Sequence, residues 1–192
     1  MRESDITPVP VKLFAGMFSP HTLLFEEIRK VLEGVYGPVD MESPVWPWEH
    51  TDYYTEEMGR ELKRKFFFFR RLINPAFISD IKLQTVQLEK EYLNKDGGRR
   101  INIDPGYMDS ARVALVSTDD YSHRVYLGKG IYGEVTLIYS GSDYRILPYT
   151  YPDFRKRDYH DIFKKARILY QKELKERGCI NLTTQVKRDK GM

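Results

Sequence analysis

The sequence predicts an α+β fold with a mixed or antiparallel sheet and about three helices. Three segments carry apolar residues at the spacing of amphipathic helices, and a strand-like apolar run precedes each of the first two. Four short strand-like segments between residues 112 and 149 follow one another through polar or Gly-containing loops. This order favours a ferredoxin-like half extended by a β-meander.

The N-terminal third predicts a strand, a helix and a second strand. Residues 11–17 are apolar on both faces, as in a central strand. Ser19 and Pro20 supply a helix N-cap and a first-turn proline. The apolar stripe of this helix would consist of Leu24, Ile28, Val31 and Leu32, and the helix would end at Gly34 or Gly37. The proline-rich residues 38–48 predict a loop or an irregular edge strand. Residues 64–73 hold four successive phenylalanines and favour a strand covered on both sides, although a helix also fits them.

The rest of the chain predicts a second helix, five strands and a third helix. Asn74 and Pro75 repeat the cap-plus-proline signal, and the second helix stops at residues 95–98. Its apolar stripe would be Phe77 or Ile78, Ile81, Thr85, Leu88 and Tyr92. The strands are expected at residues 100–103, 112–118, 123–127, 131–139 and 144–149. The third helix begins at Asp158, with Tyr159, Ile162, Phe163, Ala166, Leu169 and Tyr170 on its buried side.

Composition predicts one water-soluble domain over residues 1–180, followed by a flexible tail over residues 181–192. Hydrophobic residues make up 41% of the 192 positions, which is enough for a core. No run approaches the roughly eighteen apolar residues of a membrane span, and no secretory signal opens the chain, so we expect no membrane partner. Cys179 is the single cysteine, which excludes a disulfide framework and favours the reducing cytoplasm.

The first candidate for chemistry is the segment from Ile101 to Tyr107. We interpret it as a strand that ends in a tight turn, with Pro105 and Gly106 supplying the turn geometry. Asn102 and Asp104 would share one strand face at the end of the sheet. A structural interpretation has Asp104 bonding its own backbone, and a functional one directs its carboxylate at a metal or a phosphate-bound cation.

The second candidate is the hairpin from His123 to Tyr139. A three-residue loop at 128–130 places Leu127 opposite Ile131, Tyr126 opposite Tyr132 and Arg124 opposite Glu134. Arg124, Glu134 and Thr136 would then project together, joined by Ser117 if a four-residue loop precedes His123. The other face, with Val125, Leu127, Val135 and Leu137, would be core. The cluster is either a cross-strand ion pair or a polar pocket in which His123 transfers protons.

The third candidate is the aromatic and basic segment from Tyr149 to Arg157. Stacking rings and cations are the chemistry of an RNA-binding surface, whereas packing of the tyrosines on the sheet is the structural alternative. The net charge of +3 is below that of a typical nucleic-acid-binding domain. The sequence contains no GxxxxGK[ST] loop, no GxGxxG after a strand, no GxSxG and no HExxH.

Five motifs in order give the chain a family resemblance. They are TxYYxxEMG at 51–59, NxDPGY at 102–107, HRxYL at 123–127, GIYxEVTL at 130–137 and TYPDF at 150–154. Together they resemble a bacterial family of unknown function, made of single domains of about this length, so the resemblance covers nearly the whole chain. Some members are labelled GTP-binding proteins, whereas this sequence lacks the phosphate loop and base-reading motif of usual GTPases. The resemblance implies a concentration of polar residues at these motifs and assigns them no roles.

The leading hypothesis is binding or processing of a phosphorylated small molecule or nucleotide, with a divalent metal as a candidate cofactor. The catalytic candidates are His123, Glu134 and Asp104, of which Glu134 and Asp104 would also hold the metal or act as base. The ligand-binding candidates are Arg124, Asn102, Tyr107, Thr136, Asp153 and Glu57. The alternative is a non-catalytic module that binds RNA or a protein, and a third interpretation is that the motifs only maintain the fold. The sequence leaves open whether the protein is an enzyme.

Overall fold

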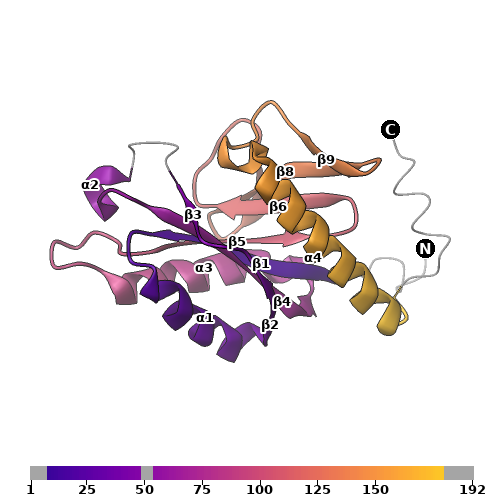
Figure 1. Ribbon diagram of the computed structural model, residues 1–192, viewed down its shortest axis with the longest axis horizontal. Coiled ribbons are helices and arrows are strands. Elements are labelled where there is room, and N and C mark those ends of the chain that lie inside the picture. The colour runs from indigo at the N-terminus through magenta and orange to yellow at the C-terminus, as the bar shows by residue number, and fades with distance from the viewer. Residues whose placement is uncertain (1–7, 49–53, 180–192) are drawn as a thin grey trace.

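A computed structural model describes residues 8–48 and 54–179, and the expected tail 181–192 lies outside them. The strands are β1 (Val11–Ser19), β2 (Val39–Glu42), β3 (Trp46–Pro47), β4 (Lys63–Ile73), β5 (Asn102–Met108), β6 (Arg112–Ser117), β7 (Val125–Gly128), β8 (Ile131–Ser140) and β9 (Asp143–Ile146) (Figure 1). The helices are α1 (Leu23–Tyr36), α2 (Thr55–Met58), α3 (Ile78–Glu89) and α4 (Arg157–Glu176). None of the helices in the described part is long and apolar enough to cross a membrane.

The strands form one sheet in the order β2-β4-β1-β5-β6-β8-β7, with β3 paired to β4 and β9 to β8. Each of the named strand pairs is antiparallel, which confirms the α+β prediction. Because β4 and β5 both run antiparallel to β1 between them, they are parallel to each other, and α3 connects them. This split β-α-β arrangement is the unit on which the ferredoxin-like expectation rests.

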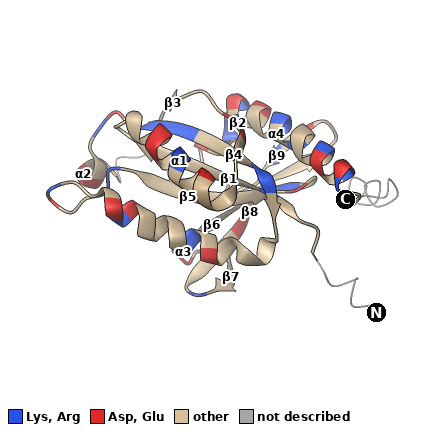
Figure 2. Ribbon diagram, turned by 90° about the horizontal axis from the view of Figure 1, so that it is seen from below, with Lys and Arg blue, Asp and Glu red and all other residues tan. Residues whose placement is uncertain are grey.

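The helices cover both faces of the sheet. α1 and α3 lie side by side on one face and α4 crosses the other (Figures 1 and 2). The four phenylalanines of β4 alternate between these layers: Phe67 and Phe69 pack with α1 and α3, and Phe66 and Phe68 pack with α4. The strand interpretation of this segment is therefore confirmed, since a period of two serves a sheet buried on both sides.

The beginning of α1 differs from the sequence expectation. The helix starts at Leu23 after Thr22, and the side chain of Ser19 instead accepts a hydrogen bond from the His21 amide. Phe25 is buried in the stripe whereas Val31 is 40% exposed, because the buried side is centred on Phe25, Ile28 and Leu32. In α3 the expected residues Ile78, Ile81, Thr85 and Leu88 are all buried.

The expected β-meander is wrong in one connection. β6 pairs with β8 and not with β7, while β7 and β9 pair with opposite ends of β8. After β6 the chain therefore skips the neighbouring position in the sheet and forms β7. β8 then returns to lie between β6 and β7. Ser117 lies opposite Tyr132, so the expected β6–β7 hairpin is wrong. Ser117 still lies near Arg124, because Asp119 contacts both residues.

The register of the β7–β8 hairpin is confirmed where Tyr126 faces Tyr132. An irregularity between Tyr126 and Gly128 then places Gly128, and not Leu127, opposite Ile131. The prediction that Val125 and Leu127 belong to the core is wrong, because β7 is an edge strand and leaves both exposed. Val135 is half-buried and Leu137 is fully buried.

The tight turn expected at Asp104-Pro105-Gly106 is also wrong. These residues lie inside β5, which pairs with β1 from Asn102 to Met108. A Cβ atom at Gly106 would lie 2.4 Å from the Phe14 ring and 2.5 Å from the Ala114 carbonyl oxygen. Glycine is needed here for close approach of side chain and backbone, since its φ is not positive.

Candidate functional site

β5 and β6 part at Pro105, and we call this place the split. The two strands pair only at Gly106–Leu115, Tyr107–Ala114 and Met108–Val113. The backbone N–H and C=O groups of alternate β5 residues point toward β1 and toward β6. Those of Ile103, Pro105 and Tyr107 point to the β6 side. Proline has no N–H to donate, and the ladder to β6 therefore ends there.

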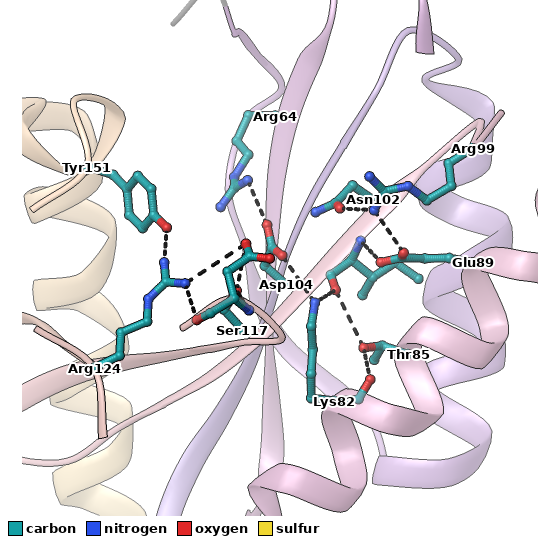
Figure 3. Close-up of polar contacts among 12 residues, drawn as sticks. Arg64, Lys82, Thr85, Glu89, Arg99, Asn102, Asp104, Ser117, Arg124 and Tyr151 are labelled. Atoms are coloured by element: carbon teal, nitrogen blue, oxygen red, sulfur yellow. Dashed lines mark hydrogen bonds and ion pairs between the residues drawn. The ribbon is translucent and has the colours of Figure 1, made fainter. Parts of the chain in front are cut away.

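Side chains of α3 take the place of the missing strand partner. The Ile103 amide donates to Glu89 Oε1 at 2.6 Å, and the Ile103 carbonyl accepts from Lys82 Nζ at 3.1 Å. Thr85 Oγ1 lies 3.5 Å from the same carbonyl oxygen. Burial raises the pKa of Glu89 above its usual value, against the opposing charge of Lys82. The backbone edge of β5 is thus satisfied by charged groups that reach the split (Figure 3).

Asp104 lies at the split between two cations. Its carboxylate oxygens are 3.3 Å from Lys82 Nζ and 3.5 Å from Arg64 Nη1, and its side chain is 30% exposed. Burial alone raises the pKa of Asp104, but the charges of Lys82 and Arg64 outweigh it and hold the pKa below the usual 3.8. Gly16 of β1 lies opposite Asp104 of β5. Because it has no side chain, it leaves room for the Arg64 guanidinium: a Cβ there would lie 2.8 Å from Nη2.

Arg64 and Asn102 lie buried beside Asp104, and one donor of Arg64 has no hydrogen-bond partner in the described chain. Arg64 is 3% exposed and lies over the rings of Phe18, Phe66 and Phe154, and its Nε donates to nothing. The Asn102 side chain is also buried, and its hydrogen bond to Asp104 helps to lower the pKa of that carboxyl. Buried donors are almost always satisfied in folded proteins, so unsatisfied ones mark a place where a further acceptor would be favourable.

Glu57 and Asn102 belong to a network centred on Arg99. Arg99 donates to both carboxylate oxygens of Glu57, at 2.6 and 2.8 Å, and to Asn102 Oδ1 at 2.7 Å. It also contacts Glu89 Oε2 at 3.2 Å. The hydrogen bond with Arg99 lowers the pKa of Glu57. This network ties α2 to β5 and α3, so Glu57 is held by internal partners.

A second group forms around Glu134 on β8. His123 Nε2 and Arg124 Nε approach Glu134 Oε2 at 3.0 and 2.9 Å, and Thr136 Oγ1 donates to Oε1 at 3.1 Å. The ring of His123 stacks on Tyr149 with centroids 4.4 Å apart. The sequence prediction that these polar side chains gather is confirmed in geometry. Glu134 Oε2 contacts His123 and Arg124, and Oε1 accepts from the Thr136 hydroxyl.

Tyr151 connects the two groups. Its hydroxyl accepts a hydrogen bond from Arg124 Nη2 (Figure 3). Burial raises the pKa of Tyr151 to about 12, and Glu134 and Asp104 add to the increase against the lowering charge of Arg124. Asp104 and the Glu134 group therefore lie within electrostatic reach of one another.

Two sequence candidates lie apart from these groups. Asp153 accepts from the Trp48 indole N–H at 3.1 Å and from the Phe154 amide at 3.0 Å, although its charge still acts on Arg64. Tyr107 packs against the core under α1 and α3, on the other face of the sheet. The structure thus joins Asp104, Asn102, His123, Arg124, Glu134 and Thr136 in two adjoining groups.

The site contains residues that sequence reasoning missed, namely Arg64, Lys82, Glu89, Arg99 and Tyr151. A signal existed for two of them, because Lys82 and Glu89 flank Thr85 at helical spacings of three and four and so share its buried stripe. Arg64 stands in a basic run before the phenylalanines, a pattern that fits a solvated surface or a phosphate-binding face.

The Asp104 and Glu134 carboxylates have cationic side chains as neighbours, whereas a metal site would bring several carboxylates together. Within residues 8–48 and 54–179, no three His, Cys, Asp or Glu side chains gather as metal ligands would. Arg64 and Lys82 approach Asp104, and Arg124 approaches Glu134. The arrangement suits a bound anion better than a bound cation.

The aromatic and basic segment expected to bind RNA is largely engaged internally. Arg155 donates to the carbonyl oxygens of Thr150 and Pro148, and Arg157 pairs with Asp143. Tyr149 and Tyr151 remain partly exposed.

Comparison with known proteins gives one match. A family model described as a domain of unknown function (DUF4416) matches residues 9–170. No curated protein and no solved structure matches the chain.

Proposed function

The chain belongs to the DUF4416 family, whose description names no activity, and from its side chains we propose that it binds a phosphorylated small molecule or nucleotide at the split. The observation that carries the proposal is Arg64 Nε, a buried donor beside Asp104 that has no acceptor in the described chain. Phosphate oxygens are strong acceptors and pair well with guanidinium groups.

The surrounding charges favour an anion of this kind. Lys82 enters the split from α3. Arg124 approaches from the β7 side, where it contacts Tyr151 and Asp119. In a partly dry site each cation attracts a phosphate more strongly than it would in water. The two acidic groups, Asp104 and Glu134, hold these cations in position before a ligand arrives.

His123 gives the site a group that can move a proton. Its Nε2 contacts Glu134, and its side chain is 23% exposed, so solvent reaches the imidazole. An imidazole can accept or give up a proton and so act as base or acid toward a bound ligand. Processing of the ligand by His123 with Glu134 is the catalytic extension of the proposal. The exposed single cysteine, Cys179, is in keeping with a reducing cytoplasm.

The test is a thermal-shift panel of inorganic phosphate, pyrophosphate, ADP and GDP, each with Mg²⁺ and with EDTA. At least one phosphate compound should raise Tm, since a ligand that binds only the folded state stabilises it. Lys82→Met should abolish the shift. Asp104→Asn should preserve or strengthen binding in EDTA, because it frees Arg64 and Lys82 from their counter-ion.

Lys129→Met is the matched control, because it removes the same charge from an exposed hairpin tip and should leave the shift unchanged. An unchanged Tm throughout the panel, or an equal shift in Lys82→Met and wild type, would refute the proposal. A shift seen only with Mg²⁺ and lost in both Asp104→Asn and Glu134→Gln would instead support the metal-assisted form.

The RNA-binding alternative has less support, because Arg155 and Arg157 are engaged inside the chain. A gel shift with bulk RNA separates it from the leading proposal: RNA binding should weaken steeply with salt and survive Glu134→Ala. The structural alternative expects Glu134→Ala and Asp104→Ala to unfold the protein without any ligand effect.

A further inference from the structure

A hollow lies at the other end of the sheet from the split, between the C-terminal end of α1 and the start of α3. Its volume is about 350 Å³, which is within the range of small-molecule sites. It includes Arg71 and Ile73 at the C-terminal end of β4, whereas Arg64 of the split lies at the N-terminal end of that strand. The hollow and the split are therefore distinct places.

The walls of the hollow combine apolar and polar side chains and are partly open to solvent. Ile73 and Ile81 pack into the core, while Phe77 on the approach to α3 is 58% exposed and Val35 on α1 is 56% exposed. An exposed aromatic ring next to an aliphatic side chain offers a flat surface for the apolar part of a ligand.

Two amide side chains that line the hollow have N–H groups that can donate to a ligand. Asn74 Oδ1 accepts from the Ala76 amide at 2.9 Å, which leaves its Nδ2 to donate. Gln84 Oε1 accepts from the Tyr36 hydroxyl, which leaves its Nε2 to donate. Both amides are fixed in orientation by these bonds.

The charged residues that line the hollow are Asp80 and Arg71. The Asp80 carboxylate pairs with Lys129. Arg71 makes no ion pair or hydrogen bond with any residue in the described part of the chain, although it lines the hollow. A guanidinium and two amide N–H groups around an apolar floor are complementary to a carboxylate, sulfonate or phosphate.

We propose that this hollow binds a small organic anion with a flat apolar body. The anionic group contacts Arg71, Asn74 and Gln84, and the apolar body lies between Val35 and Phe77. The site is independent of the split and of the function proposed there.

The test uses the full chain and the fluorescent aromatic sulfonate 8-anilinonaphthalene-1-sulfonate as probe. We expect saturable binding of one probe per chain, displaced by benzoate and not by benzyl alcohol. Arg71→Ala should weaken the probe roughly tenfold, the effect of one charge-assisted hydrogen bond of about 1.5 kcal/mol. Val35→Trp should fill the hollow and abolish saturable binding.

Arg70→Ala is the matched control, because it removes the same charge one residue away, where the side chain does not line the hollow. Amide shifts in NMR spectra should be confined to residues around Val35, Asn74 and Phe77. Equal affinities of Arg71→Ala and Arg70→Ala, saturable binding retained in Val35→Trp, or shifts located at the split would each overturn the proposal. Lys82→Met, which tests the split, should leave probe binding unchanged, so the two proposals fail separately.

Discussion

Asp104 depends on its neighbours for its charge. It keeps an ionised carboxylate although burial opposes the charge, because Lys82 and Arg64 lie within 3.5 Å. The folded state therefore holds the pKa of Asp104 below its ordinary value, and the ionised form stabilises the fold.

We predict that Asp104→Asn lowers the free energy of unfolding by roughly 1 to 2 kcal/mol at pH 7, a modest value because the side chain is partly exposed. The stability that Asp104 contributes is complete above its unfolded pKa and is lost as the pH falls through the lower folded pKa. The difference between the two proteins should thus shrink below about pH 4. Urea unfolding at several pH values from 7 to 3 measures it.

Asp96→Asn is the control for that series, because Asp96 lies exposed in the loop after α3 and has no ion pair in the described chain. It should change stability little at any pH. A difference for Asp104→Asn that stays constant through acid would show that its charge does not stabilise the fold.

Single residues explain where sequence reasoning succeeded and failed. The pairing of Arg124 with Glu134 could be predicted, because a short glycine loop fixes the register of a hairpin. The exposure of Val125 and Leu127 could not, since it depends on β7 being the last strand of the sheet. Pro105 and Gly106 are typical of turns, and only the close approach of Phe14 explains why they stand inside a strand.

At the scale of elements, α3 acts as a partner for a strand. Its residues Lys82, Thr85 and Glu89 bind the edge of β5 where β6 departs. The sequence shows the helix and its buried stripe, but not that polar members of the stripe satisfy a strand backbone. Predicting that role would require knowing which strand edge faces the helix.

We predict that Glu89→Ala destabilises the protein by about 1 to 3 kcal/mol, because it leaves the Ile103 amide buried without an acceptor. Hydrogen exchange of that amide should accelerate more than exchange of the Tyr107 amide, which lies in the paired part of β5. Glu89→Gln retains an acceptor oxygen and should recover part of the protection. Equal acceleration at Ile103 and Tyr107 would contradict this local role.

At the scale of the whole molecule, α4 closes the second face of the sheet. Phe163 packs edge-on against Phe14, Phe66 and Phe68, with ring centroids 5.0 to 5.5 Å apart. The α+β class and the three long helices could be predicted from periodicity. The passage of the chain over β8 could not, because hairpin signals favour neighbouring strands.

We predict that Phe163→Ala lowers the free energy of unfolding by about 3 to 5 kcal/mol, since it empties the centre of this ring cluster. Ile168→Ala on the outer side of α4 is the control and should change stability by less than about 0.5 kcal/mol, because Ile168 is 66% exposed. Urea unfolding measures both. Similar costs for the two variants would mean that α4 is not docked as described.

The short pairing between β5 and β6 has a mechanical consequence. The sheet consists of two leaves, β2-β4-β1-β5 and β6-β8-β7 with β9, and their shared spine is three residue pairs long. A rotation of one leaf against the other would have its axis at that spine. Such a rotation would move Arg124 and Tyr151 away from Arg64 and Lys82. The distances between Arg124 and the other two cations would therefore measure the motion.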